Sequence, residues 1–281
     1  MSERRAMALG GAWYPAQAAA CTRDLAGFIA DGVTPRPGAR LCVVPHAGWR
    51  YSGRVAARAV AALAPAEPVA LIVVLGGHLG RRDPLVTMSR GAWQTPYGWL
   101  PIHTGFAEAL GAFDNVVDET QQGFLQDNSI EVQLPIVHRR FPAAELLPIR
   151  VPPNSRALAL GEALGHYLEQ SGLSAVVLAS TDLTHYGPAY GFTPAGPLPG
   201  AREWMTQNDQ GFIDAVSRVD GTAVLDAANR HHSACSAGSV AAACRLARDW
   251  GARFELLDYT TSADVAPAEN AVGYLGGVFA A

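Results

Sequence analysis

Polar side chains follow three separate apolar runs of the chain, at the point where each run ends. His46 follows LCVVP, His78 follows VALIVVLGG, and Asp182 follows SAVVLAST. A short apolar run bounded by Pro or Gly is typical of a buried strand. Ligands of open α/β sheets bind beyond the carboxyl ends of the strands. We therefore expect these three side chains to meet at one edge of a sheet.

Two further residues extend this set. His185 lies three positions after Asp182, and Cys235 comes shortly before a helical stretch at residues 240–249. A thiol near a helix N-terminus has a lowered pKa because the helix dipole favours the thiolate. Imidazole and thiolate together suit Fe, Cu or Zn. Three protein ligands with an open position are typical of a catalytic metal site, so the pattern favours such a site.

Each of these residues also has a plain structural explanation. A histidine after a strand often only satisfies buried polar groups, and Asp182 by itself could cap a turn. Cys235 by itself is more often a small buried hydrophobe than a ligand. A nucleophilic pair of Cys235 with His231 or His232 also stays open. The joint pattern, and not any single residue, favours the metal site.

Composition excludes several classes of protein. The 281 residues are 49% hydrophobic and 16% charged, with a net charge of -4. No basic block suggests a nucleic-acid partner, and no apolar segment has the length of a membrane span. The four cysteines form no C-x-x-C pair and no disulfide pattern, which favours a cytoplasmic location. Dinucleotide-binding, phosphate-loop and nucleophile-elbow motifs are absent.

Apolar runs alternate with helical stretches along the whole chain. Strands are expected at residues 41–45, 69–75, 145–151, 174–179, 254–259 and 273–279, and helices at 18–29, 54–63, 127–138, 157–170, 204–219, 221–229 and 240–249. This alternation predicts one α/β domain over residues 1–281, with a mostly parallel or mixed central sheet flanked by helices. The oligomeric state is left open, a homo-oligomer included.

Several short motifs resemble those of one known family. They are AWYPA, PHAGWRYSG, LGGH, DNSIEVQLP, STDLTHYG and the spacing His231-x-x-x-Cys235, and they span almost the entire chain. The chain thus resembles the Memo family, also called protein B of the AmmeMemoRadiSam set. That family is similar in fold to the class III extradiol dioxygenases, which are non-haem iron enzymes that open catechol rings.

The resemblance implies roles for individual residues. His46, His78 and Cys235 match metal ligands, and Asp182 and His185 match residues beside the metal, with His185 as the acid/base. Cysteine stands where the dioxygenases use glutamate, so ring-opening chemistry does not transfer automatically. Asn128 stands where the family usually has histidine, and asparagine exchanges no proton near neutral pH.

A substrate pocket is expected around these residues. Aromatic side chains close to the motifs could wall a pocket for a planar substrate, or could belong to the core. The expected substrate-binding residues are Trp13, Tyr14, Trp49, Tyr51, Tyr186, Asn128 and His231.

The sequence is compatible with three functions. The first is an Fe(II)-dependent, dioxygenase-like oxidoreductase that acts on an aromatic or other small substrate with O2, with Cu or Zn as other candidate metals. The second is a metal-binding scaffold that binds a peptide or small ligand without turnover. The third is zinc-assisted hydrolysis. No nucleic-acid or membrane partner is expected.

Overall fold

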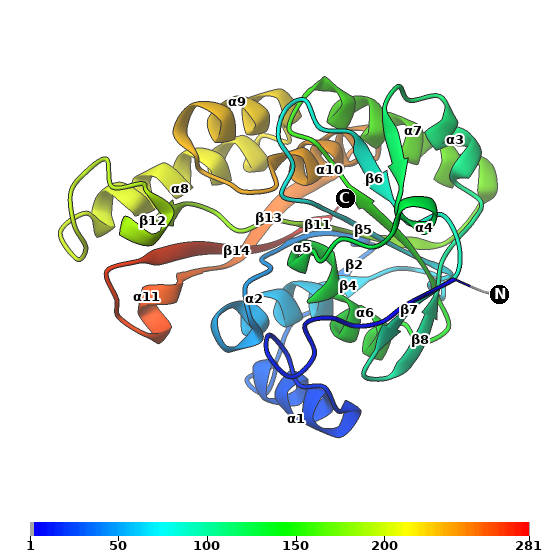
Figure 1. Cartoon of the computed structure of the whole chain (residues 1–281), viewed down its shortest axis with the longest axis horizontal. Coiled ribbons are helices and arrows are strands. Elements are labelled where there is room, and N and C mark those ends of the chain that lie inside the picture. The colour runs from blue at the N-terminus through cyan, green and yellow to red at the C-terminus, as the bar shows by residue number, and fades with distance from the viewer. Residues whose placement is uncertain (1–2, 281) are drawn as a thin grey trace.

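A computed structural model describes residues 3–280, apart from the side chains of residues 121 and 122. Its central feature is a mixed sheet in the order β12-β14-β3-β11-β5-β10-β6-β9, with β13 paired to β14 (Figure 1). The strands of this sheet are β3 (Leu41–Val44), β5 (Leu71–Gly76), β6 (Leu85–Thr87), β9 (Val116–Asp118), β10 (Glu145–Arg150), β11 (Ala175–Ser180), β12 (His185–Tyr186), β13 (Arg253–Thr261) and β14 (Ala271–Ala280). The predicted α/β class with a mixed sheet is confirmed.

The centre of the sheet is parallel. Strand β11 lies between β3 and β5 and is parallel to both, and β10 is parallel to β5. Strand β14 is antiparallel to β3, and β6 is antiparallel to β10. The carboxyl ends of β3, β11 and β5 therefore lie side by side at one edge.

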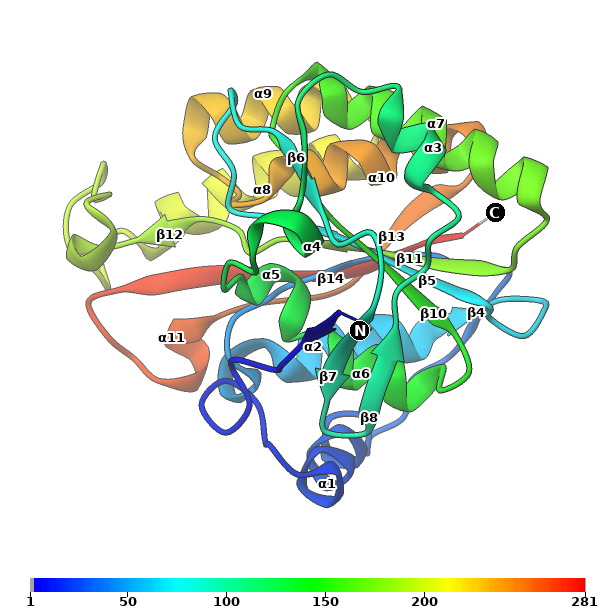
Figure 2. The same cartoon turned by 45° about the vertical axis from the view of Figure 1, so that its right-hand side comes forward.

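Helices cover both faces of this sheet (Figures 1 and 2). One face carries α7 (Ser155–Ser171), α8 (Arg202–Ser217), α9 (Gly221–His231) and α10 (Ala237–Asp249), and the other carries α1 (Ala18–Phe28), α2 (Trp49–Ala62) and α6 (Leu134–Arg140). Shorter elements complete the chain: β1 (Arg4–Arg5), β2 (Arg36–Pro37), β4 (Leu63–Ala64), β7 (Ala92–Thr95), β8 (Gly98–Pro101), α3 (Ala107–Gly111), α4 (Glu119–Gln122), α5 (Asn128–Glu131), a 3-10 turn (Pro188–Tyr190) and α11 (Ser262–Val265).

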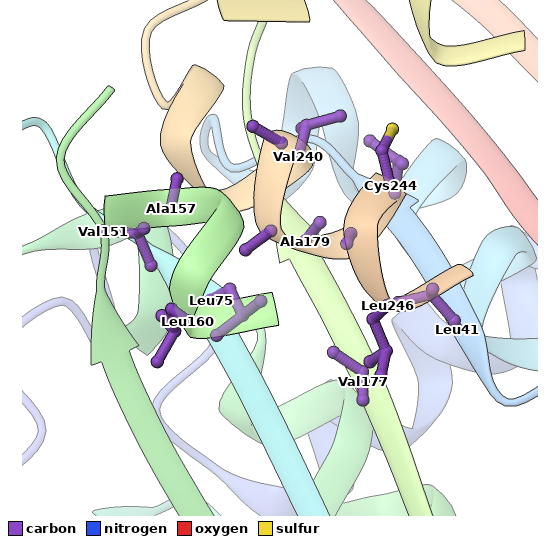
Figure 3. Packing of buried hydrophobic residues seen from close by; sticks show 14 of the residues in the cluster. Leu41, Leu75, Val151, Ala157, Leu160, Val177, Ala179, Val240, Cys244 and Leu246 are labelled. Atoms are coloured by element: carbon purple, nitrogen blue, oxygen red, sulfur yellow. The ribbon is translucent and has the colours of Figure 1, made fainter. Parts of the chain in front are cut away.

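The core divides into two layers because side chains alternate along each strand. In β3, Leu41 and Val43 face the α7–α10 layer, whereas Cys42 and Val44 face the layer of α1, α2 and α6. Figure 3 shows the first layer, in which Leu160 of α7 and Val240 of α10 pack over the strands. The central strands are buried along their whole length, so they read in the sequence as unbroken apolar runs.

Three expected helices differ in the structure. Helix α2 begins at Trp49, five residues before the expected start, so the GWRYSG segment forms its first turns. The expected helix at 127–138 is split into α5 and α6, and Pro135 lies at the start of α6, where its missing N–H needs no partner. Helix α8 spans Arg202–Ser217, two residues earlier at each end than expected, and it buries Met205, Phe212 and Ile213.

Within residues 3–280, no helix combines the length and the apolar character needed to cross a membrane.

Candidate metal centre and pocket

Two imidazoles and one thiol converge at the carboxyl edge of the central strands. His46 follows β3, His78 follows β5, and Cys235 precedes α10. The Nε2 atom of His46 lies 3.1 Å from Nε2 of His78 and 3.1 Å from Sγ of Cys235. One potential ligand atom from each residue lies within 4.8 Å of the other two. The convergence expected for the strand ends is therefore present.

Strand order explains why the chain brings these residues together. Because β11 lies between β3 and β5, Asp182 at the end of β11 has His46 on one side and His78 on the other. The Asp182 Oδ1 atom accepts a hydrogen bond of 2.7 Å from the backbone N–H of His46. Cys235 joins the edge through its own backbone N–H, which donates to the Asp182 carbonyl at 3.2 Å.

The turn after β5 depends on glycine. Gly77 has a φ of 106°, which side-chain-bearing residues rarely adopt, and a Cβ there would lie 2.6 Å from Cβ of Arg150. Ser129 and Ser236 fix the turn, because Gly77 N–H donates to Ser129 Oγ and Ser236 Oγ donates to the Gly77 carbonyl. This turn directs the next side chain, His78, toward the other two ligands.

Electrostatics in the cluster favour a thiolate. Burial alone raises the pKa of the Cys235 thiol, but the charges and hydrogen bonds of His46 and His78 outweigh burial and hold this pKa well below its usual value. The backbone N–H of Asp182 also donates to Sγ at 3.3 Å. Thiolate is the form of cysteine that binds metals.

Ser180 and Gln133 orient the first ligand. Nδ1 of His46 lies 3.1 Å from Ser180 Oγ, which leaves Nε2 toward the cluster. Gln133 Nε2 donates to Ser180 Oγ at 3.2 Å and to the Pro45 carbonyl at 2.7 Å. Hydrogen bonds of this kind on the far nitrogen commonly fix the tautomer of a metal-binding histidine.

Asp127 and Arg150 orient the second ligand. Nδ1 of His78 lies 3.7 Å from Asp127 Oδ2, which lies 3.8 Å from Arg150 Nη1. Burial lowers the pKa of His78, but the hydrogen bonds and charges of Asp127 and Cys235 raise it overall to about 10. The pKa of His46 is also raised, since Cys235 and Asp182 outweigh its burial. A metal must displace these protons, so its affinity should fall as the pH falls.

The donor set fits a metal ion. Ligand bonds of about 2.0–2.3 Å in tetrahedral geometry separate neighbouring ligand atoms by roughly 3.3–3.6 Å. The observed separations of 3.1 Å and the overall limit of 4.8 Å are close to this spacing. Two imidazole nitrogens and a thiolate suit Fe, Cu or Zn. The side chain of His78 is 41% exposed, so the cluster opens toward a pocket.

A pocket of about 630 Å³ meets the cluster at His78, whereas His46 and Cys235 do not line it. We call it the metal-facing pocket. Of the expected site residues, those that line it are Trp13, Tyr51, His78, Asn128, Asp182 and His185. Tyr190, Tyr274, Ser262 and Asn270 complete much of the remaining wall. Asn128 also donates from Nδ2 to the His46 carbonyl at 2.9 Å, which ties the pocket wall to the first ligand.

One hydrogen bond fixes the tautomer of neutral His185. Its Nδ1 lies 3.0 Å from the Leu183 carbonyl, and because a carbonyl only accepts, Nδ1 carries the proton in the neutral ring. The lone pair is then on Nε2. The ring of Tyr190 meets the imidazole edge-on, with 4.9 Å between the ring centroids. Asp182 is only 3% exposed, and burial raises its pKa despite the nearby charge of His46.

Four expected substrate residues lie outside the metal-facing pocket. Tyr186 is fully buried because β12 pairs with β14, and successive residues of a strand face opposite ways, so His185 faces the pocket and Tyr186 the core. Tyr14 donates to Glu131 Oε1 at 2.9 Å, and Trp49 donates from Nε1 to the Val132 carbonyl. His231, at the end of α9, borders a separate hollow with Arg218 and Ser233.

The residues that orient the two histidine ligands were not predicted from the sequence. Asp127 lies in the DNSIEVQLP motif and caps α5 by accepting from the Ser129 N–H, but its contact with His78 was not expected. Ser180 lies inside the STDLTH motif at the end of β11, so its place at a strand end was the available signal. Gln133 lies inside the DNSIEVQLP motif, whereas Arg150 gave no local signal, because its role comes from contacts with distant segments.

A buried carboxyl supports the loop that carries His185. Asp209 of α8 is fully buried, its Oδ1 accepts from the Thr184 N–H at 2.9 Å, and its Oδ2 accepts from the Tyr259 hydroxyl at 2.8 Å. Burial raises the pKa of Asp209 to about 6, although its hydrogen bonds oppose the rise. The folded protein therefore holds a proton here that the unfolded chain releases at lower pH.

This proton predicts a pH dependence of stability. The stabilising effect of protonated Asp209 is complete below the unfolded pKa of about 4 and is lost as the pH rises through about 6. Between these pH values, this proton makes the free energy of unfolding of the wild type decline by roughly 3 kcal/mol. In Asp209→Asn that decline should be absent. Urea unfolding of both proteins from pH 4 to 7 measures the difference. Parallel pH profiles would contradict the assignment.

A family model described as Memo-like protein matches residues 5–278. The chain belongs to the Memo family. A MEMO1 family protein of Methanosarcina acetivorans is 32% identical over 279 residues, which cover 97% of each chain. A MEMO1 family protein of Methanopyrus kandleri is 32% identical over 89% of this chain and 85% of its own length. One of Thermococcus onnurineus is 32% identical over 84% of this chain and 85% of its own length. The expected family is thus confirmed, and the Memo protein described here has a His-His-Cys cluster that could hold a metal.

Proposed function

We propose that this Memo protein is a mononuclear iron enzyme that oxidises an aromatic or other small chelating substrate with O2. The observation that carries the proposal is that the His46–His78–Cys235 cluster reaches the metal-facing pocket through His78, which lines it. The exposed face of the cluster leaves room for ligands other than protein. An open coordination position of this kind is typical of catalytic and not structural metal sites.

Bound Fe(II) would supply a redox centre at which substrate and O2 are held together. The protein supplies binding and orientation. Trp13, Tyr51 and Tyr190 offer aromatic surface for a ring, and Ser262 and Asn270 offer polar groups at the pocket wall. Pockets that bind small molecules typically combine apolar walls with a few placed polar groups in this way.

His185 is the proposed acid/base. Its Nδ1–H is engaged by the Leu183 carbonyl, so Nε2 is the atom that can accept a proton from a substrate hydroxyl and return it later. Asp182 lines the same pocket, and its carboxyl is held by the backbone N–H of His46. Asn128 can position a ligand by hydrogen bonding but cannot exchange its proton.

Metal content and oxygen uptake test this function. Protein purified without chelators should contain iron, and after anaerobic loading with Fe(II) it should consume O2 with at least one catechol-like compound. His185→Gln should retain the metal and lose about 100-fold or more of the uptake rate, the usual range for loss of an acid/base group. Leu183 contributes only its carbonyl, so Leu183→Ile is a matched control that keeps the hydrogen bond.

Two results would contradict the proposal. Absence of O2 uptake by iron-loaded protein with every compound, together with tight binding of a ligand, would favour a binding protein without turnover. Purification with stoichiometric zinc and ester or amide hydrolysis that depends on it would favour metal-assisted hydrolysis.

A further inference from the structure

A second hollow of about 640 Å³ lies beside the metal-facing pocket. It is formed by the N-terminal loop, helix α1 and the first turn of α2, and we call it the arginine hollow. Among the described residues, the two hollows share only Ala12 and Trp13 in their linings. Trp13 is 37% exposed, so its indole forms the partition between them. A ligand that extends past this side chain would occupy both.

The two hollows differ in charge. The chain has no lysine, so every side-chain cation apart from histidine is an arginine. No arginine lines the metal-facing pocket, whose carboxylate is Asp182. The arginine hollow is lined by Arg23 and Arg50, with Asp24 as its one carboxylate. The metal-facing pocket therefore offers no guanidinium to a carboxylate, and a ligand carboxylate is expected on the far side of Trp13.

The two guanidinium groups are free to take an anion. Neighbouring arginines on α2 are already paired, because Arg54 and Arg58 both bind Asp31. Among residues 3–280, neither Arg23 nor Arg50 is within ion-pair distance of a carboxylate. The guanidinium of Arg50 lies 5.7 Å from the ring centre of Tyr51, a residue of the metal-facing pocket, so Arg50 is close to the boundary. Guanidinium is well suited to bind a carboxylate through two hydrogen bonds.

The partition between the hollows is fixed in position. Oε1 of buried Glu131 accepts hydrogen bonds from the backbone N–H groups of Ala8 and Leu9 and from the Tyr14 hydroxyl, at 2.7, 2.7 and 2.9 Å. The carbonyl of Trp13 accepts a further bond of 2.8 Å from the N–H of Trp49. The backbone of the loop that carries Trp13 is thus tied to α5 and α2.

From these observations we propose that the substrate is an aromatic carboxylate whose ring end enters the metal-facing pocket and whose carboxylate tail passes Trp13 to reach Arg23 and Arg50. The placement of the ring end rests on the proposed function, because that function assigns the metal-facing pocket to a chelating aromatic group. The tail site rests only on the arginine hollow and can be tested separately.

Matched ligands with and without charge test the tail site. Calorimetry under anaerobic conditions would compare 3-(3,4-dihydroxyphenyl)propionate with its amide, and longer homologues of both, on iron-loaded protein. The acid should bind about tenfold more tightly than the amide at one or more tail lengths, as expected for a charge-assisted bidentate contact. The preference should vanish in the double variant Arg23→Gln/Arg50→Gln. Arg253→Gln, at an exposed arginine outside both hollows, should keep it.

The possible results separate this inference from the proposed function. Equal binding of acid and amide at every tail length would rule out the tail site. Tighter binding of the acid that persists in the double variant would rule it out as well. If catechol binds no better to iron-loaded than to metal-free protein, the proposed function fails. The tail site is then tested on metal-free protein with 4-phenylbutyrate and its amide. Tighter binding of the acid that is lost in the double variant would support the tail site, and equal binding of acid and amide would rule it out.

Discussion

Replacement of Cys235 by serine should lower the affinity of this protein for Fe(II) by at least about 100-fold. The change removes the thiolate, whose pKa the imidazoles of His46 and His78 hold well below normal against the effect of burial. A serine hydroxyl stays protonated near neutral pH and is a poor ligand. Loss of a residue that only orients a ligand already lowers metal affinity or activity by roughly 10–100-fold, so loss of a ligand should exceed that. Anaerobic titration against a chelator of known affinity measures the change.

Cys244→Ala is the matched control for this experiment. Cys244 is fully buried in α10, on the same helix that follows Cys235, and burial raises the pKa of its thiol to about 12. It lies in the apolar core and should leave the metal affinity unchanged while lowering stability slightly. Wild-type affinity in Cys235→Ser would show that the thiol is not a ligand, and the metal site would then need a different third residue.

Replacement of Glu119 by alanine should reduce the free energy of unfolding by about 3–5 kcal/mol. Glu119 is buried between two arginines: its Oε2 accepts from Arg5 Nη1 at 2.7 Å, and its Oε1 accepts from Arg150 and from the Leu125 N–H. The Arg5 guanidinium also stacks 3.6 Å from the ring centre of Trp93. Without the carboxylate, two buried cations face each other without their shared partner, which is a severe penalty in a low-dielectric interior.

The Glu255→Ala variant shows whether burial is the cause. Glu255 pairs with Arg36 through two close contacts of 2.7 and 2.5 Å, but this pair is exposed. Exposed pairs contribute at most about 1 kcal/mol, so this variant should lose far less stability in urea unfolding. Equal losses in the two variants would refute the argument. Because Arg150 also faces Asp127 beside His78, Glu119→Ala should in addition weaken metal binding.

The sequence by itself determined the strands and the residues at their ends. The runs that end at His46, His78 and Asp182 are apolar throughout because the central strands are buried on both faces, and that signal is local. Parallel strands of one sheet share an edge, so convergence of the three residues followed without knowledge of the strand order. The early start of α2 was missed, because glycine, tryptophan and tyrosine in its first turns carry little helical signal.

Only the tertiary structure decided which distant groups complete the site. Cys235 meets His46 across 189 positions of sequence, and no local pattern encodes such a contact. Because β12 pairs with β14, Tyr186 faces the core and His185 faces the pocket. The packing of the N-terminal loop against α5 placed Trp13 between the metal-facing pocket and the arginine hollow. Side-chain periodicity reports burial along one element, whereas the chemistry here depends on which elements become neighbours.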